Sequence, residues 1–332
     1  MHGRKKKVLT EPEVESLRLK TEGYNKLASA ISEMKKAHKH DLLSLDLIGK
    51  MIVVNPDFYS LWNYRREILE ENCQLFDDQV VERELSISAD AITKNPKSYC
   101  AWHHRLWIWS KVNIDISKEL SLCDRFLAAD QRNFHCWNYR RAIVLLGNVE
   151  SLHEISFSMK KIEENFSNYS AFHHRSVYIK DTVCDLKDGL DKELGIVHNA
   201  IFTEPDDQSA WWYYQFLMNW AKDGASAGAS AGASAAVASI SSGEEFRSIL
   251  RREIKSVRSL LELECECKWA LVMQAFLLQM SVSASVTAGS DIICELERNE
   301  MMAERCEILR KLCLLDTGHR NRYLALLAGA TS

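Results

Sequence analysis

The chain has 332 residues, of which 46% are hydrophobic and 27% charged, and its formal net charge is -4. This balance is typical of a folded globular protein and lacks the basic excess that nucleic-acid binding requires. Its longest apolar runs fall well short of the roughly 18 residues that a membrane helix needs, so we expect no membrane insertion.

Residues 1–15 begin with a basic run that includes Arg4 and Lys5 and then become acidic. Such a composition predicts a mobile N-terminal segment unless a partner holds it. A helix is predicted next, from about Ser16 to Lys36. The ten cysteines are scattered, several at apolar positions, which favours reduced thiols and a cytoplasmic location.

One phrase recurs along the middle of the chain. It reads NPDFYSLWNYRR at 55–66, NPKSYCAWHHRLW at 95–107, DQRNFHCWNYRR at 130–141, NFSNYSAFHHRS at 165–176 and EPDDQSAWWYY at 204–214. Its aromatic residue returns at steps of 40, 35, 35 and 39, which is typical of stacked helical hairpins. The sequence therefore predicts an all-α fold, a crescent-shaped α-α superhelix built as a solenoid of hairpin repeats.

Each repeat is expected to contain two helices. Proline interrupts the chain, one helix starts just beyond it, and a second helix follows a short loop. The second helices are predicted at 82–94, 118–129, 152–164 and 192–202, with Ser151 and Glu154 as a capping box for the third. The core aromatic and the arginine three residues later share one helix face. These structural residues are Trp62, Arg65, Trp102, Arg105, Trp137, Arg140, Phe172, Arg175 and Trp211.

The predicted repeats occupy residues 16–223 and continue over 244–332 in the same domain. Trp269 and Tyr323 mark two weaker repeats at the end of the array, where atypical units are common. Between them, residues 224–243 repeat GASA and contain few side chains that could be buried. We interpret this stretch as a flexible spacer and as an engineered replacement for a removed insertion.

No catalytic triad, phosphate-binding glycine loop or dinucleotide fingerprint is present, so catalysis by this chain alone is not expected. The candidate site is the row of turns where the first helices begin. There Lys97 and His135 suit an anion, because a cation and an N–H donor would add to the positive end of a helix. The alternative is that Lys97 is a solvated lysine and His135 a local hydrogen-bonding residue. We interpret the histidine doublets 103–104 and 173–174 as packing residues, and Cys265 and Cys267 as two small helix residues, not as metal ligands.

The recurring N-P-x-x-x-x-x-W-x-x-R phrase resembles the repeat of protein prenyltransferase α subunits, over the whole chain except the GASA stretch. Within that family, NPKSYCAWHHRLW, ADQRNFHCWNYRR, the opening MHGR and the turn NFSNYS are most similar to the Rab geranylgeranyltransferase (type II) branch. Phe134 points the same way, because farnesyltransferase-type relatives have a tyrosine there. The immunoglobulin-like insertion and the leucine-rich repeat domain of some members are not seen in this sequence.

The resemblance implies an enzyme subunit that is not active alone and works in a heterodimer. Its β subunit would hold the catalytic zinc, and the heterodimer would join geranylgeranyl from geranylgeranyl diphosphate to C-terminal cysteines of Rab GTPases through a thioether. A Rab escort protein would present the substrate. By the same resemblance Lys97 and His135 lie near the leaving diphosphate. His2 is considered as an exchangeable ligand to the partner's zinc, because catalytic zinc leaves one position open.

Two other functions remain open at this stage. One is the α subunit shared by farnesyltransferase and geranylgeranyltransferase type I, which would be favoured by a proline-rich N-terminal tail and a tyrosine at position 134. The other is a non-enzymatic helical-repeat scaffold that binds peptides. A scaffold needs no cation at the turns, so Lys97 and His135 distinguish it from the enzyme subunit.

Overall fold

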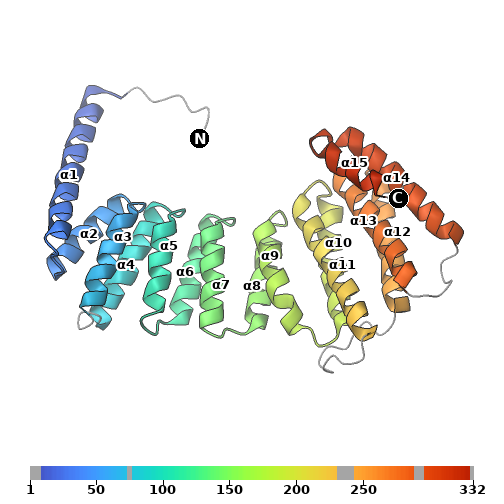
Figure 1. Ribbon diagram of the computed structural model, residues 1–332, viewed down its shortest axis with the longest axis horizontal. Helices are drawn as coiled ribbons and strands as arrows, with labels where there is room; N and C mark the ends of the chain where they lie inside the picture. Colours follow the sequence, from blue (N-terminus) through green and yellow to red (C-terminus); the bar gives the residue numbers. More distant parts are fainter. Residues whose placement is uncertain (1–8, 73–76, 230–242, 288–294, 330–332) are drawn as a thin grey trace. The chain divides into compact units, whose positions relative to one another are not determined.

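The computed structural model describes residues 9–72, 77–229, 243–287 and 295–329, and every regular element in these ranges is a helix (Figure 1). The prediction of an all-α fold is thus confirmed. The helices are α1 (Glu11–Lys36), α2 (Leu42–Val54), α3 (Tyr59–Glu71), α4 (Asp78–Lys94), α5 (Tyr99–Trp109), α6 (Ile116–Ala129), α7 (Phe134–Leu146), α8 (Ser151–Glu164), α9 (Tyr169–Thr182), α10 (Leu186–Thr203), α11 (Gln208–Ala229), α12 (Gly243–Leu263), α13 (Lys268–Thr287), α14 (Glu295–Leu315) and α15 (Arg320–Ala328). None of them is both long and apolar enough to cross a membrane.

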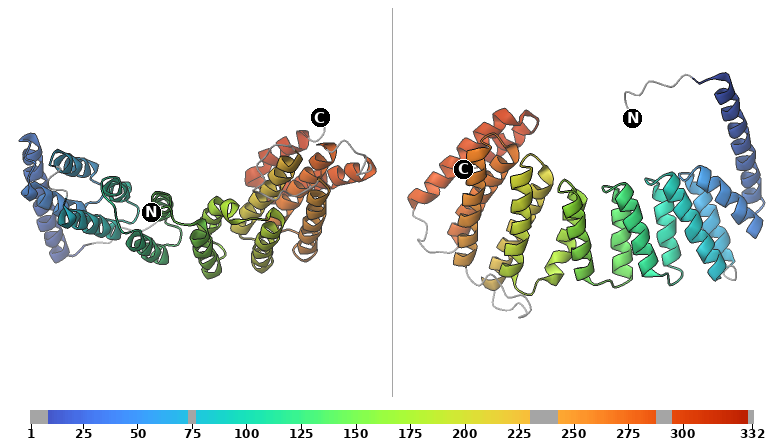
Figure 2. Two further views of the ribbon diagram at one scale, coloured as in Figure 1. Left: turned by 90° about the horizontal axis from the view of Figure 1, so that it is seen from below. Right: turned by 180° about the vertical axis from the view of Figure 1, so that it is seen from behind.

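The helices pair as hairpins within two compact units. Residues 1–149 contain α1 and the hairpins α2–α3, α4–α5 and α6–α7, whereas residues 150–332 contain α8–α9, α10–α11, α12–α13 and α14–α15. Inside each unit, consecutive hairpins stand side by side: α3 contacts α5 and α5 contacts α7 in the first unit, and α9 contacts α11 and α11 contacts α13 in the second (Figure 2). Each unit is therefore a stack of repeats, as the sequence periodicity predicts.

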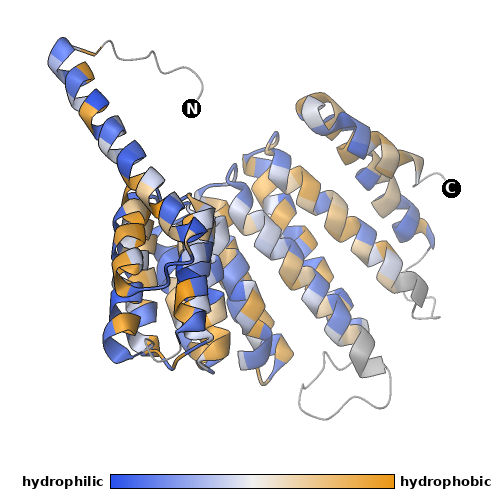
Figure 3. Ribbon diagram, turned by 60° about the vertical axis from the view of Figure 1, so that its left-hand side comes forward, coloured by the Kyte–Doolittle hydropathy of each residue, from blue (hydrophilic) through white to orange (hydrophobic). Residues whose placement is uncertain are grey.

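Aromatic residues of the recurring phrase fill the space between the helices. Trp62, Trp137 and Trp211 are each 1% exposed, as is Phe172. Apolar positions recur along the hairpin helices in Figure 3, whereas α1 is mostly hydrophilic. Burying such large rings contributes much of the stability of a hairpin, because apolar burial yields about 25 cal/mol per Å².

The four tryptophans at the core position of the recurring phrase also stabilise the turns that precede them. The indole N–H donates to a backbone carbonyl six residues earlier, which satisfies the polar edge of a buried ring. These bonds run from Trp62 to Pro56 (2.8 Å), from Trp102 to Pro96 (2.9 Å), from Trp137 to Gln131 (2.9 Å) and from Trp211 to Pro205 (2.9 Å). The phrase thus places its aromatic residue where it serves both the core and the turn.

In three of the phrases the arginine joins neighbouring hairpins through a buried glutamate, and we call this arrangement the junction. In α3, Arg65 donates to Glu84 of α4 (Nε to Oε2, 2.6 Å), and the Nε2 atom of His104 in α5 lies 2.9 Å from the same carboxylate. Arg105 of α5 likewise donates to Glu119 of α6 (2.7 Å). One glutamate therefore receives donors from the helices on both sides.

The same junction recurs with tyrosine in place of histidine. Tyr139 donates to Glu119 at 2.7 Å. In the second unit, Arg175 and Tyr213 both donate to Glu193, each at 2.7 Å. Sequence reasoning found the arginines but missed the glutamates, since those lie in the second helices, outside the recurring phrase.

Several helices begin earlier than the sequence predicts. Helix α1 starts at Glu11 instead of about Ser16, and the second helices start at 78, 116, 151 and 186. The reason is that aspartates cap three of these helices, since Asp77, Asp115 and Asp185 each accept a backbone N–H from the first turn. The aspartate signal was present in the sequence but was not used.

Two local predictions are wrong. Ser151 is not a helix cap, because α8 is preceded by Glu150, and Glu154 is fully buried, where its carboxylate pairs with His174 (2.6 Å). In the sixth repeat the core position is taken by Leu271, which is 4% exposed, and not by Trp269. Of the GASA stretch, residues 224–229 continue α11, and 230–242 lie outside the described residues.

Candidate functional site

The turns that precede the helices with the recurring phrase (α3, α5 and α7 in the first unit, α9 and α11 in the second) form a continuous row within each unit. In the first unit Ser98 Oγ donates to the carbonyl of Pro56 (3.0 Å), and Asn133 Nδ2 donates to that of Pro96 (3.0 Å). In the second unit Ser209 Oγ donates to the carbonyl of Ser167 (3.1 Å). These side chains lie at the N-terminal ends of their helices, so the row brings several helix N-termini to one edge.

Lys97 lies in the turn between α4 and α5. Its backbone N–H donates to Asn95 Oδ1 (3.1 Å), which fixes the turn, while its side chain is exposed. Among the described residues no carboxylate forms an ion pair with its ammonium group. The charge is therefore available to a ligand at the edge of the first unit.

His135 lies in the first turn of α7 and is 6% exposed. Its ring packs edge-on against Tyr99, with centroids 4.3 Å apart and planes at 88°, and it also contacts Phe134. Burial and then the positive charge of Lys97 lower the pKa of His135 below its usual 6.5. At neutral pH the imidazole is therefore uncharged and offers one N–H donor.

The structure thus brings together the two residues that the sequence singled out. Tyr99, two residues after Lys97 in the chain, packs on the His135 ring, and the positive charge of Lys97 contributes to the lowered pKa of His135. A lysine charge, an imidazole N–H and the N-termini of α5 and α7 together favour an anion, since backbone N–H groups and the helix dipole add to the positive potential.

Sequence reasoning missed Tyr99, which completes this cluster. It is the first residue of α5, is 70% exposed, and packs against His135. Tyr59 and Phe134 occupy the same position in α3 and α7 and are 68% and 48% exposed. The recurrence of an aromatic residue at this position was visible in the repeated phrase, but only the buried tryptophans were considered.

The other candidates do not join the cluster. His104 and His174 are buried and pair with Glu84 and Glu154, and His103 contacts Arg66. In the described part of the chain no group of three or more His, Cys, Asp or Glu side chains is placed to hold a metal ion. His2 lies outside the described residues.

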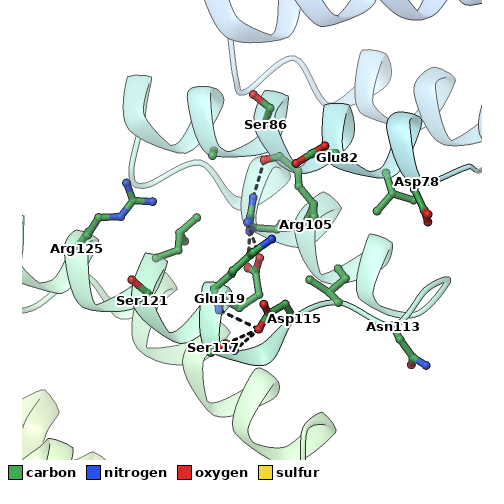
Figure 4. Close-up of a pocket in the computed structure, with 16 residues that line it drawn as sticks. Asp78, Glu82, Ser86, Arg105, Asn113, Asp115, Ser117, Glu119, Ser121 and Arg125 are labelled. Atoms are coloured by element: carbon green, nitrogen blue, oxygen red, sulfur yellow. Dashed lines mark hydrogen bonds and ion pairs between the residues drawn. The ribbon is translucent and has the colours of Figure 1, made fainter.

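A groove of about 810 Å³ lies elsewhere, between α4 and α6 (Figure 4). Its floor is the junction of Arg105 with Glu119, whose two Nε and Nη2 bonds measure 2.7 and 2.6 Å. Arg105 also donates to the carbonyl of Leu85 and to Ser88 Oγ, so its donors are already used. The buried cation at the floor of the groove is therefore not available to a ligand, and the turn row remains the candidate site.

Comparison with known proteins relates the repeats to one family. The model described as "Protein prenyltransferase alpha subunit repeat" matches residues 44–72, 81–112, 116–146, 151–181 and 190–221. In the structure these ranges cover the first five hairpins, α2 to α11.

Curated proteins named "Geranylgeranyl transferase type-2 subunit alpha" are similar to the chain. The one from Dictyostelium discoideum is 31% identical over 344 residues, covering 98% of this chain and 99% of the relative. The one from Rattus norvegicus is 38% identical over 240 residues, covering 67% of this chain but only 42% of the longer relative.

A solved structure gives a similar fold. "Candida albicans protein geranylgeranyltransferase-I complexed with GGPP" superposes with a TM-score of 0.67 at 18% identity, covering 99% of this chain and 95% of the other. At that identity the likeness concerns the fold alone.

Proposed function

Because this chain belongs to the protein prenyltransferase α subunit family, we propose that it is the α subunit of a heterodimeric Rab geranylgeranyltransferase. The observation that supports this is the unpaired Lys97 beside His135 at the turn row, together with similarity to type-2 α subunits along the chain. The farnesyltransferase-type alternative is less favoured, because Phe134 stands at the position beside His135.

In the proposed reaction the chain acts on the leaving group. A cysteine thiolate of the Rab substrate bonds to C1 of geranylgeranyl diphosphate, the C1–oxygen bond breaks, and diphosphate departs with the bonding electrons. Negative charge on the diphosphate grows during this step, so donors fixed in advance stabilise the transition state more than the ground state. Lys97 would supply a full charge and His135 a neutral N–H.

Other parts of the enzyme belong to its partners in this proposal. The β subunit would hold the catalytic zinc, which keeps the substrate sulfur as a thiolate when bound. A Rab escort protein would present the substrate in the cytoplasm, and His2 would be an exchangeable ligand to that zinc. The α chain alone would have no activity, since it supplies neither the thiolate nor the isoprenoid cavity.

The test compares two lysines in the complex with the type-2 β subunit. Lys97→Ala should lower the single-turnover rate of geranylgeranyl transfer to an escorted Rab by about 10²-fold, as expected for loss of an oxyanion donor. Lys94→Ala, which removes an exposed lysine three residues earlier in the sequence, is the matched control and should transfer at the wild-type rate.

Each outcome bears on a different part of the proposal. If Lys97→Ala transfers as fast as wild type, the diphosphate role is wrong. If the chain forms no stable complex with the β subunit, the subunit role itself fails, and a peptide-binding scaffold becomes the better explanation.

A further inference from the structure

One buried position has the same charge in five helices and the opposite charge in a sixth. In each of the five helices, a buried glutamate lies ten residues before the last residue of the helix. These are Glu84 in α4, Glu119 in α6, Glu154 in α8, Glu193 in α10 and Glu253 in α12. The corresponding residue of α14 is Arg305, which is 5% exposed.

The partners of this position also change in the last repeat. Helices α3, α5, α7 and α9 have an arginine three residues after the core aromatic, and α11 has a tyrosine there. Helix α13 has Gln274, three residues after Leu271. Gln274 donates to Glu304 (3.2 Å), and its Oε1 atom has no partner among the described residues. Within the same residues the Nε and Nη1 atoms of Arg305 also lack a hydrogen-bond partner.

A buried guanidinium without an anion is costly, because removing a charge from water must be offset by pairing. Glu304, the residue before Arg305 in the chain, accepts instead from Arg258 (2.5 Å). Among the described residues no carboxylate forms an ion pair with Arg305. A bound anion would supply the missing charge.

A cavity of about 170 Å³ opens onto Arg305, and we call it the Arg305 cavity. Its walls come from α11, α13, α14 and α15, and most of them are apolar, with Phe276, Leu309 and Leu312 among them. A second cation, Arg322, also lines it. One water occupies about 30 Å³ of the liquid, so the cavity has the volume of several waters. This size suits a small organic molecule better than an inorganic ion.

We propose that the Arg305 cavity binds a small monocarboxylate that carries a short apolar group. The carboxylate pairs with the guanidinium of Arg305, whose planar fork matches two carboxylate oxygens. The apolar group packs against Phe276 and Leu309. The ligand thus supplies the negative charge that a glutamate of the chain supplies in the other hairpins.

This chemistry is shared by a free short-chain acid and by the C-terminus of a peptide that ends in an apolar residue. Calorimetric titration of the full chain with hexanoate tests the first source, and titration with N-acetyl-leucine tests the second. Hexanamide and N-acetyl-leucinamide are the neutral controls and should bind at least about tenfold more weakly, because they lose the ion pair. The stronger of the two acids identifies the source.

Variants locate the binding. Arg305→Met should weaken the acid at least about tenfold, whereas Arg310→Met, at an exposed arginine of the same helix, should leave its affinity unchanged. Ala275→Met keeps Arg305 and fills the cavity, so it should also abolish binding and serves if Arg305→Met fails to fold. The proposal is overturned if neither acid binds, if the amides bind equally well, or if Ala275→Met binds like wild type.

Discussion

A buried glutamate compensates the arginine charge at each junction, and Glu84 shows the effect most strongly. Burial opposes its ionisation, but the His104 hydrogen bond and the charge of Arg65 outweigh burial and lower the Glu84 pKa to about 2. The carboxylate is therefore ionised throughout the physiological range. Its loss would leave Arg65 buried without its anion.

We expect Glu84→Gln to lower the free energy of unfolding by about 3 kcal/mol, because breaking a buried ion pair leaves an uncompensated charge. Glu82→Gln, at an exposed glutamate of the same helix, is the control and should change stability by less than about 0.5 kcal/mol. Urea unfolding followed by circular dichroism measures both. Equal stability of the two variants would show that Arg65 does not depend on Glu84.

At this scale the sequence predicted residues that lie within the recurring phrase and missed those outside it. Lys97 and His135 could be selected because each occupies a turn whose place in the repeat is fixed. Glu84 and Glu119 could not, because they resemble the many surface glutamates until the ends of their helices are known. Arg305 was missed for the same reason.

The hairpin turn is the element that keeps neighbouring repeats in register. Ser98 accepts the backbone N–H of Ala101 (3.4 Å) and donates to the carbonyl of Pro56 in the preceding turn (3.0 Å). One side chain thus caps α5 and ties it to the previous hairpin. Helix ends were predicted well, because asparagine–proline and aspartate mark them, whereas helix starts depend on such local capping bonds.

We expect Ser98→Ala to cost about 1–2 kcal/mol, since it removes a cap and leaves a buried carbonyl without its donor. Ser110→Ala is the control, because Ser110 is exposed and donates only to Trp107 of its own helix (2.7 Å). The two variants can be compared by thermal unfolding. A cost for Ser98→Ala no larger than for Ser110→Ala would mean that the turn row is held by other contacts.

The stability of the whole chain should depend on pH through its buried charges. Burial lowers the pKa of His104, although Glu84 opposes the shift, so the unfolded chain binds a proton below pH 6.5 that the folded chain does not. Glu253 has a lowered pKa as well, because hydrogen bonds from His198 and Tyr214 outweigh its burial. In both cases the unfolded state takes up more protons as the pH falls, and stability decreases.

We therefore expect the melting temperature to be highest above pH 6.5 and to fall as the pH drops, most steeply between 4.5 and 2, where Glu84 is ionised only in the folded chain. Calorimetric scans across this range measure the profile. In Glu84→Gln the acid branch should be shallower. A melting temperature that stays constant from pH 7 to 3 would contradict the assigned shifts.

The donor on the far side of a junction is either a histidine or a tyrosine, with His104 on Glu84, Tyr139 on Glu119 and Tyr213 on Glu193. The carboxylate requires only one N–H or O–H at that point, so the two side chains are interchangeable there. Exchange of histidine for tyrosine at this position consequently requires no compensating mutation in the neighbouring repeat. A repeat that carries its own arginine and glutamate can likewise be duplicated without such a mutation. The junction thereby gives the array a modular route for evolutionary change in length.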